Sequence, residues 1–180
     1  MKNWSEYITE AYDHMVDTVE TRELGKLLAQ PNEYMQRDWI NINTTLDVYK
    51  DEGGNDSDKN GSGYDLISKN GLRIQSKFRS GGFHLETTRR NSKKNQGAAS
   101  TSGHVAYSVG EADVYCFTKP NGNFLDPTQA EIIAIPERAL IDPKNPGFLR
   151  RSVSKTIQKQ WEGKSAETLE MLDAESKSRK

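Results

Sequence analysis

The sequence predicts an α/β fold with a central mixed β-sheet flanked by helices. The first 50 residues show helical periodicity, the middle of the chain carries short strand-like runs between turn residues, and the last part returns to helical patterns. At 180 residues with 33% hydrophobic content, the chain suits one compact domain better than two. We expect a single domain over 1–180, with helices at 1–50, a sheet core at 61–135 and C-terminal helices at 136–175.

Helical spacing dominates the first part of the chain. Apolar residues recur there at intervals of three and four, which is one face of an amphipathic helix: Trp4, Ile8, Tyr12, Met15 and Val19. A second helical piece is expected at 22–29. Pro31 suits the first turn of a third helix, which we expect to reach about Tyr49.

Strand-like runs follow a polar segment at 51–63 that has no apolar residue and is expected to be a flexible loop. Three runs at 64–68, 72–79 and 83–89 are joined by glycine-containing turns, and they predict an antiparallel meander.

The second half of the chain continues this pattern. After a polar segment at 91–103, the run "VAYSV" is expected to end a short helix. Strands are predicted at 112–119 and 130–135, and the second is nearly all apolar, so we expect it inside the sheet. Helices are predicted around 153–161 and 166–172.

Charge is unevenly distributed along a chain whose net charge is only -1. Residues 1–70 carry 7 Lys or Arg against 14 Asp or Glu, whereas residues 71–164 carry 15 against 8. A basic region on a neutral chain favours a polyanionic partner, although such clusters are often only solvated surface. No apolar run approaches the roughly 18 residues that span a bilayer, and no signal peptide is apparent. We therefore expect a cytoplasmic protein with no membrane partner.

The strand predicted at 72–79 has a polar face that suggests chemistry. Arg73, Gln75, Lys77 and Arg79 alternate along it with Leu72, Ile74, Ser76 and Phe78. Asp65 begins the preceding strand, so a carboxylate, an amide oxygen and a lysine can converge at the edge of two neighbouring strands. Hard divalent cations prefer such oxygen ligands. The alternative is a solvated strand face.

The arrangement of Asp65, nine residues, then Gln75-Ser76-Lys77 resembles the PD-(D/E)xK nuclease superfamily. The surrounding stretch, Gly61 to Asn95, resembles type II restriction endonucleases in particular. The resemblance implies a restriction-endonuclease-like core and a single nuclease domain whose sheet is catalytic. It also implies that Asp65, the Gln75 side-chain oxygen and the Ser76 carbonyl hold Mg²⁺, while Lys77 orients or activates the attacking water.

The sequence departs from the family pattern at two positions. Tyr64 stands where Pro is common, and Gln75 stands where Glu is common. Because Gln75 is neutral, a further carboxylate should be needed to bind the metal. The family often supplies a Glu from the preceding helix, and Glu33 is our candidate. The other candidates are Glu20, Glu23 and Glu86.

Two basic regions accompany this candidate site. The first is expected to contact DNA and lies directly after the predicted catalytic strand: Arg79, Arg89, Arg90, Lys93 and Lys94. The second either holds the flanking DNA backbone or is a solubilising surface: Lys144, Arg150, Arg151, Lys155, Lys159 and Lys164. For His84 we expect a structural or DNA-contacting role, because the resemblance assigns water activation to Lys77.

These features predict Mg²⁺-dependent, sequence-specific cleavage of double-stranded DNA by a type II restriction endonuclease. A palindromic target would imply a homodimer. The alternatives are another nuclease of the same fold, serving repair, recombination or a phage, and a DNA-binding module whose catalytic site has lapsed.

Overall fold

The computed structural model of this chain describes residues 21–50, 64–78, 83–87, 105–119 and 122–179. These residues form an α/β structure around one mixed β-sheet, so the predicted coarse fold class is confirmed. Among the described helices, none is both long and apolar enough to cross a membrane.

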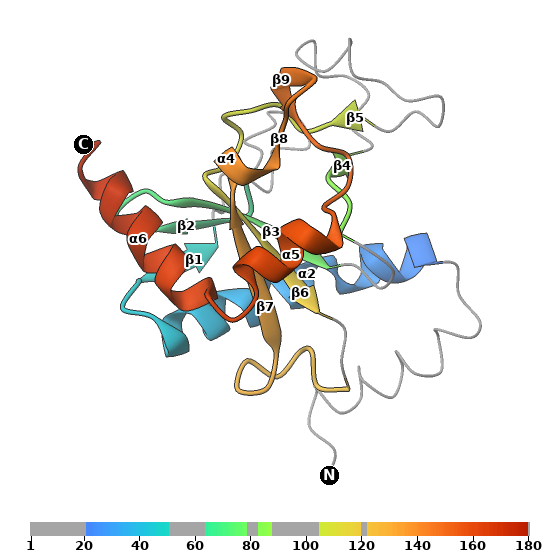
Figure 1. The fold of residues 1–180 in the computed structure, drawn as a ribbon. Helices are drawn as coiled ribbons and strands as arrows, with labels where there is room; N and C mark the ends of the chain where they lie inside the picture. The colour runs from blue at the N-terminus through green and yellow to red at the C-terminus, as the bar shows by residue number, and fades with distance from the viewer. Residues whose placement is uncertain (1–20, 51–63, 79–82, 88–104, 120–121, 180) are drawn as a thin grey trace.

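The central sheet has five strands in the order β1-β2-β3-β6-β7 (Figure 1). Their bounds are β1 (Val48–Lys50), β2 (Leu66–Ser68), β3 (Arg73–Phe78), β6 (Val114–Lys119) and β7 (Glu131–Pro136). The first three strands are antiparallel neighbours, β6 runs parallel to β3, and β7 runs antiparallel to β6. The parallel pair lies at the centre of the sheet.

Both faces of this sheet are covered. On one face, α2 (Thr21–Asn43) and α6 (Ser165–Lys177) enclose a core that includes Ile74 and Cys116. On the other face, α5 (Lys155–Trp161) and several short segments pack against the side chains of β6 and β7 that point the opposite way. Burial on both faces explains why β6 and β7 have almost no alternation in their sequences.

The short segments on the second face form two small antiparallel sheets and one helical turn. Their bounds are β4 (Glu86–Thr87), β5 (Val105–Ala106), α4 (Glu137–Leu140), β8 (Ile141–Asp142) and β9 (Asn145–Leu149). β4 pairs with β5, and β8 pairs with β9. Two single bridges, His84 with Ser152 and Ser108 with Phe148, join these segments into one layer.

Several predicted elements are confirmed. The strands expected at 64–68, 72–79, 112–119 and 130–135 correspond to β2, β3, β6 and β7. The two C-terminal helices correspond to α5 and α6. The helix predicted at residues 4–19 and the polar segments at 51–63 and 91–103 lie outside the described residues.

The predicted N-terminal helices differ from the observed structure. The pieces expected on either side of Pro31 are one helix, α2, with Pro31 inside it. The prediction that this helix reaches Tyr49 is wrong, because it ends at Asn43 and β1 follows. Burial alternates from Leu46 to Tyr49, which is the period of a strand rather than a helix.

The predicted meander is also wrong in its third strand. The segment at 83–89, which was expected to pair with β3, instead contributes β4, and β4 pairs with β5. The third antiparallel strand is β1, on the other side of β2. Phe83 explains the difference, because its ring stacks on the Phe117 ring, 4.5 Å away, and so lies over the sheet rather than in it.

Two further expectations fail for reasons of packing. The run "VAYSV" contains strand β5 rather than a helix end. β7 lies at the edge of the sheet rather than inside it, yet it is buried because α6 covers one face and the second core covers the other.

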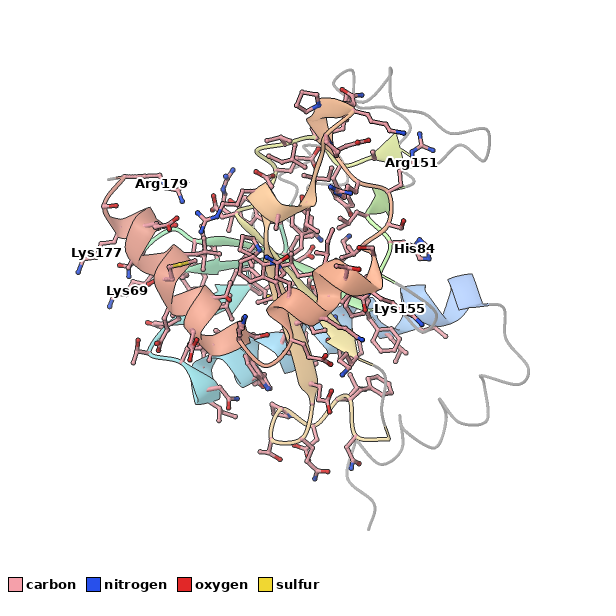
Figure 2. The ribbon with its side chains drawn as sticks, viewed as in Figure 1. Lys69, His84, Arg151, Lys155, Lys177 and Arg179 are labelled. Carbon is pink, nitrogen blue, oxygen red and sulfur yellow. The ribbon has the colours of Figure 1, made fainter. Side chains whose placement is uncertain are left out.

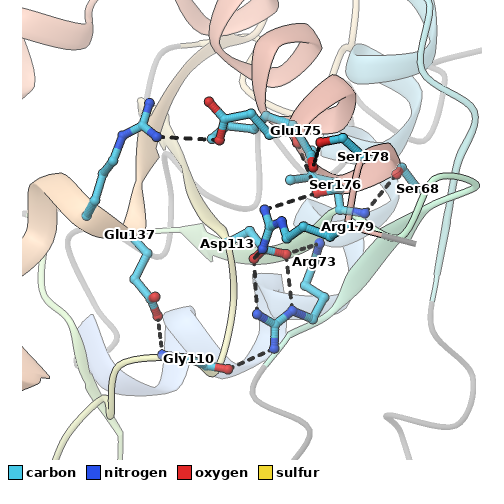
Figure 3. Close-up of polar contacts among 12 residues, drawn as sticks. Ser68, Arg73, Gly110, Asp113, Glu137, Glu175, Ser176, Ser178 and Arg179 are labelled. Atoms are coloured by element: carbon cyan, nitrogen blue, oxygen red, sulfur yellow. Dashed lines mark hydrogen bonds and ion pairs between the residues drawn. The ribbon is translucent and has the colours of Figure 1, made fainter.

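An ion-pair cluster ties the start of β3 to the segment before β6 (Figure 3). Asp113 accepts the Arg73 backbone N–H at 2.9 Å and the two guanidinium nitrogens at 3.0 and 3.1 Å. Arg73 also donates to the Gly110 carbonyl at 2.8 Å, and Arg179 reaches Asp113 at 3.3 Å. Burial acts to raise the pKa of Asp113, but the hydrogen bonds from Arg73 outweigh it and the pKa is lowered.

We expect Asp113→Ala to lower the free energy of unfolding by about 2 kcal/mol at neutral pH, measured by urea denaturation, because it leaves Arg73 without its acceptor. The lowered pKa means that the Asp113 contribution is complete above the unfolded-state pKa of about 3.9 and is lost as the pH falls through the folded-state value. The variant should therefore lose less stability than the wild type on acidification.

The control for this prediction is Glu175→Gln, which removes the exposed contact with Arg138 at 3.4 Å. It should cost under about 1 kcal/mol. Equal losses in the two variants would contradict a special contribution from Asp113.

Candidate active site

Strand register brings Asp65 next to Gln75. Leu66 pairs with Ile74, and the Asp65 N–H donates to the Ile74 carbonyl at 3.0 Å, so Asp65 stands opposite Gln75 where β2 begins. One carboxylate oxygen, Oδ2, accepts the Ser76 backbone N–H at 2.9 Å and the side-chain amide of Gln75. The carboxylate is therefore held against the second half of β3.

Gln75 does not lie on a solvated face, as the alternative reading of its strand would require. Only 4% of the residue is exposed, and its partner in the parallel register is the fully buried Tyr115. Its Nε2 approaches Asp65 Oδ2 and, at 3.4 Å, the Ser76 carbonyl oxygen. Its Oε1 is buried and has no hydrogen-bond partner among the described residues. An orphaned buried oxygen is costly unless something binds it.

Lys77 is held by an aromatic side chain rather than by an acid. Its Nζ lies 4.4 Å from the centroid of the Tyr107 ring and donates a hydrogen bond to the Tyr107 hydroxyl. Tyr107 is 4% exposed and fixed in place. Among the described residues, no carboxylate lies within 4.0 Å of the Lys77 ammonium. Its positive charge is therefore not neutralised by an ion pair in this part of the chain.

Glu33 reaches the same region from α2. Its Oε2 lies 2.7 Å from the Lys50 ammonium, and the two side chains are only 16% and 10% exposed. Burial raises the pKa of Glu33, and the negative charge of Asp65 raises it further, whereas Lys50 and Lys77 act to lower it. Lys50 pairs in register with Leu66, the residue after Asp65, so the Glu33–Lys50 pair lies beside the start of β2.

A buried network sets the position of α2 against the sheet. Asn32, the residue before Glu33, donates to Ser76 Oγ at 2.8 Å and accepts from Thr118 Oγ1 at 2.6 Å. One turn further along, Gln36 donates to Thr118 Oγ1 at 2.8 Å and to the Cys116 carbonyl at 3.0 Å. These contacts connect the helix to both strands of the parallel pair.

Four residues of this site were not predicted from the sequence. A signal existed for Asn32 and Gln36, because they share the buried side of the helix with Ile40 at four-residue spacing. Lys50 and Tyr107 gave no such signal. Tyr107 is 30 residues from Lys77 in the chain and meets it only through the fold.

Of the predicted metal-binding and catalytic residues, the structure brings Asp65, Gln75 and Ser76 into contact, and Lys77 follows Ser76 on β3. Glu33 lies on α2 and pairs with Lys50. The rivals of Glu33 are not placed: Glu20 lies outside the described residues, and the side chains of Glu23 and Glu86 are not described. The predicted DNA-contacting cluster also lies outside the described residues: Arg79, Arg89, Arg90, Lys93 and Lys94.

The donor atoms at this site suit a hard divalent cation. No group of three or more His, Cys, Asp or Glu side chains suited to a metal occurs in the described ranges. The described residues instead offer the Asp65 carboxylate, the Ser76 carbonyl and the orphaned Gln75 Oε1, with the Glu33 carboxylate nearby on α2 beside Lys50. A half-turn of the terminal Gln75 torsion exchanges Nε2 and Oε1 and would direct an oxygen toward Asp65 and the Ser76 carbonyl. An all-oxygen donor set of this kind fits Mg²⁺.

The proximity of Glu33 to Asp65 can be tested without any activity. We expect Asp65→Asn to lower the pKa of Glu33, because a neighbouring negative charge is removed, and Lys50→Met to raise it, because a hydrogen-bonded cation is removed. Carbon-13 NMR titration of the Glu33 carboxyl measures both shifts. No response to Asp65→Asn would place Glu33 outside the site.

Comparison of the chain with protein-family models, curated proteins and solved structures finds no match.

Proposed function

We propose that this protein is a Mg²⁺-dependent endonuclease with a restriction-endonuclease-like core, acting on double-stranded DNA. The observation that carries the proposal is the Lys77 ammonium, which rests on Tyr107 with no carboxylate within 4.0 Å among the described residues, on the strand where Asp65 meets Gln75 and its orphaned amide oxygen. Such a set of groups suits a substrate that brings its own negative charge, together with a cation that neutralises the acids.

The reaction class follows from the charges at the site. Hydrolysis of a phosphodiester needs a positioned water and positive charge near the phosphoryl oxygens, where negative charge develops. When bound, the divalent cation would supply charge neutralisation and a more acidic water. Lys77 would place its ammonium beside the attacking water or a phosphoryl oxygen, and Tyr107 would keep that ammonium in the site.

The remaining residues would prepare the site for the cation. The Ser76 N–H stabilises the charged form of Asp65 by a hydrogen bond at 2.9 Å. Lys50 acts in the same sense on Glu33, against the effect of burial. The Gln75 side chain and the Ser76 carbonyl would add uncharged oxygen donors.

Sequence specificity and a homodimer complete the proposal of a type II restriction endonuclease, since a palindromic target is matched by two-fold symmetry. One observation favours a second candidate, a DNA-binding module with a lapsed site. The Gln75 amide donates to Asp65 and so satisfies that carboxylate without a metal. Incubation of plasmid DNA with the protein and Mg²⁺ separates the two, because a binding module would retard DNA in a gel without cutting it.

Asp65→Asn should abolish cleavage and leave DNA binding largely intact. The amide keeps the shape of the side chain and an oxygen that can accept the Ser76 N–H, but it lacks the charge that a metal requires. Plasmid cleavage and a gel-shift assay measure the two effects. Cutting at a rate near that of the wild type would refute the role of Asp65.

Lys77→Ala should slow cleavage about a thousandfold, or roughly 4 kcal/mol in the activation barrier, while binding in the absence of Mg²⁺ is unchanged. Single-turnover cleavage measures the rate. Lys177→Ala, on the exposed end of α6, is the control and should cut normally. If the loss at Lys77 merely follows weakened binding, this lysine is a phosphate contact rather than a catalytic residue.

Gln75 should respond in opposite directions to two substitutions. Gln75→Glu adds a stronger ligand and should lower the Mg²⁺ concentration needed for half-maximal cleavage. Gln75→Leu removes the oxygen at similar size and should raise that concentration steeply or abolish cutting. A Mg²⁺ titration of cleavage that is the same for both variants would exclude Gln75 as a ligand.

A further inference from the structure

Three exposed basic side chains form a surface beside the candidate active site. They are His84, Arg151 and Lys155, and we name this surface the basic ridge. We propose that the basic ridge binds the phosphate backbone of duplex DNA on one flank of the phosphate that is cut. This inference rests on the proposed function and adds the path of the substrate across the protein.

The ridge is built by two segments that run side by side. His84 forms an antiparallel bridge with Ser152, the Leu85 N–H donates to the Arg151 carbonyl at 2.9 Å, and the Val153 N–H donates to the Phe83 carbonyl at 2.8 Å. α5 then begins at Lys155. The fold therefore joins a residue from the middle of the chain to two from its C-terminal part.

Two independent chains of contacts connect the ridge to Lys77. In the first, Lys77 pairs in register with Phe117, and the Phe83 ring stacks on Phe117 at an interplanar angle of 9°. Phe83 is the neighbour of His84.

The second series of contacts starts at the Tyr107 hydroxyl, which holds the Lys77 ammonium. The backbone carbonyl of Tyr107 accepts the Leu149 N–H at 2.8 Å, and Leu149 lies two residues before Arg151. Both paths run through the layer that covers β6 and β7, so the ridge lies at the outer edge of that layer.

The Lys155 ammonium is exposed and available to a ligand. Within the described part of the chain, neither His84 nor Lys155 forms an ion pair with a carboxylate within 4.0 Å. Other cations of the protein are neutralised internally, as Arg73 is by Asp113 and Lys119 by Glu131 and Glu162. Cations without internal partners bind DNA phosphates with release of counterions.

Figure 2 shows where the exposed basic side chains lie. His84, Arg151 and Lys155 are on one side of the molecule, beside β4 and the start of α5. Lys69, Lys177 and Arg179 are on the opposite side, near the end of α6. Because Lys177 lies on the side of the molecule away from the ridge, it provides a matched control of equal charge.

The test measures binding of a short DNA duplex to the full chain in EDTA, by fluorescence anisotropy over a range of KCl concentrations. We expect Lys155→Gln to weaken binding and to lower the slope of log K against log salt by about 0.9, the loss of one phosphate contact. Lys177→Gln should leave affinity and slope unchanged. Circular dichroism confirms that both variants keep their folded structure.

Every other outcome overturns either the basic ridge or the proposed function. If the wild type binds the duplex but Lys155→Gln has the same slope, or Lys177→Gln lowers it equally, the basic ridge is overturned while the nuclease proposal stands. If the wild type binds no duplex, the proposed function fails. Equal affinity for polyglutamate would also overturn the ridge as a nucleic-acid surface.

Discussion

The buried contacts of Asn32 and Gln36 with the parallel strand pair are the constraint on which the candidate site depends. They tie α2 to β3 and β6 through Ser76, Thr118 and the Cys116 carbonyl. Buried amides that lose their partners are costly, so the helix cannot slide or rotate against the sheet without breaking several hydrogen bonds. Because Glu33 directly follows Asn32, this network also determines where that carboxylate meets the strands.

The electrostatics of the site are a balance between two acids and two lysines that play different roles. Lys50 pairs with Glu33, whereas Lys77 rests on the face and hydroxyl of Tyr107. An aromatic ring attracts a cation without cancelling its charge. The contact therefore keeps an ammonium at a partly buried position and leaves its charge available to an anion, which an ion pair with Asp65 would not.

The second layer of the fold gives this site its surroundings. The short segments that carry Phe83, Tyr107 and Leu149 cover the sheet face on which Gln75 and Lys77 lie. Their backbones are joined by single bridges and isolated hydrogen bonds rather than by a continuous sheet. This layer both buries the aromatic core against β6 and β7 and presents basic side chains at its outer edge.

Local sequence patterns were sufficient for the coarse fold and for the proximity of Asp65, Gln75 and Lys77. Strand periodicity and a short turn place residues ten apart on neighbouring strands, so this part of the site follows from the backbone period and one hairpin. The same patterns misjudged elements whose pairing is not local. The region around 83–89 has strand-like residues, but whether it joins β3 or crosses the sheet depends on where Phe83 finds its partner.

Contacts between distant parts of the chain were decided only by the tertiary structure. One hydrogen bond joins Asn32 to Ser76, which is 44 positions away in the sequence, and another joins Lys77 to Tyr107, which is 30 positions away. No periodicity encodes such pairs, because they arise when whole elements pack and each buried polar group must find a partner within the assembled core. The sequence by itself therefore determined which residues are able to perform the chemistry. The packing of α2 and of the second layer decided which of these residues meet and which of their charges are neutralised by a neighbour.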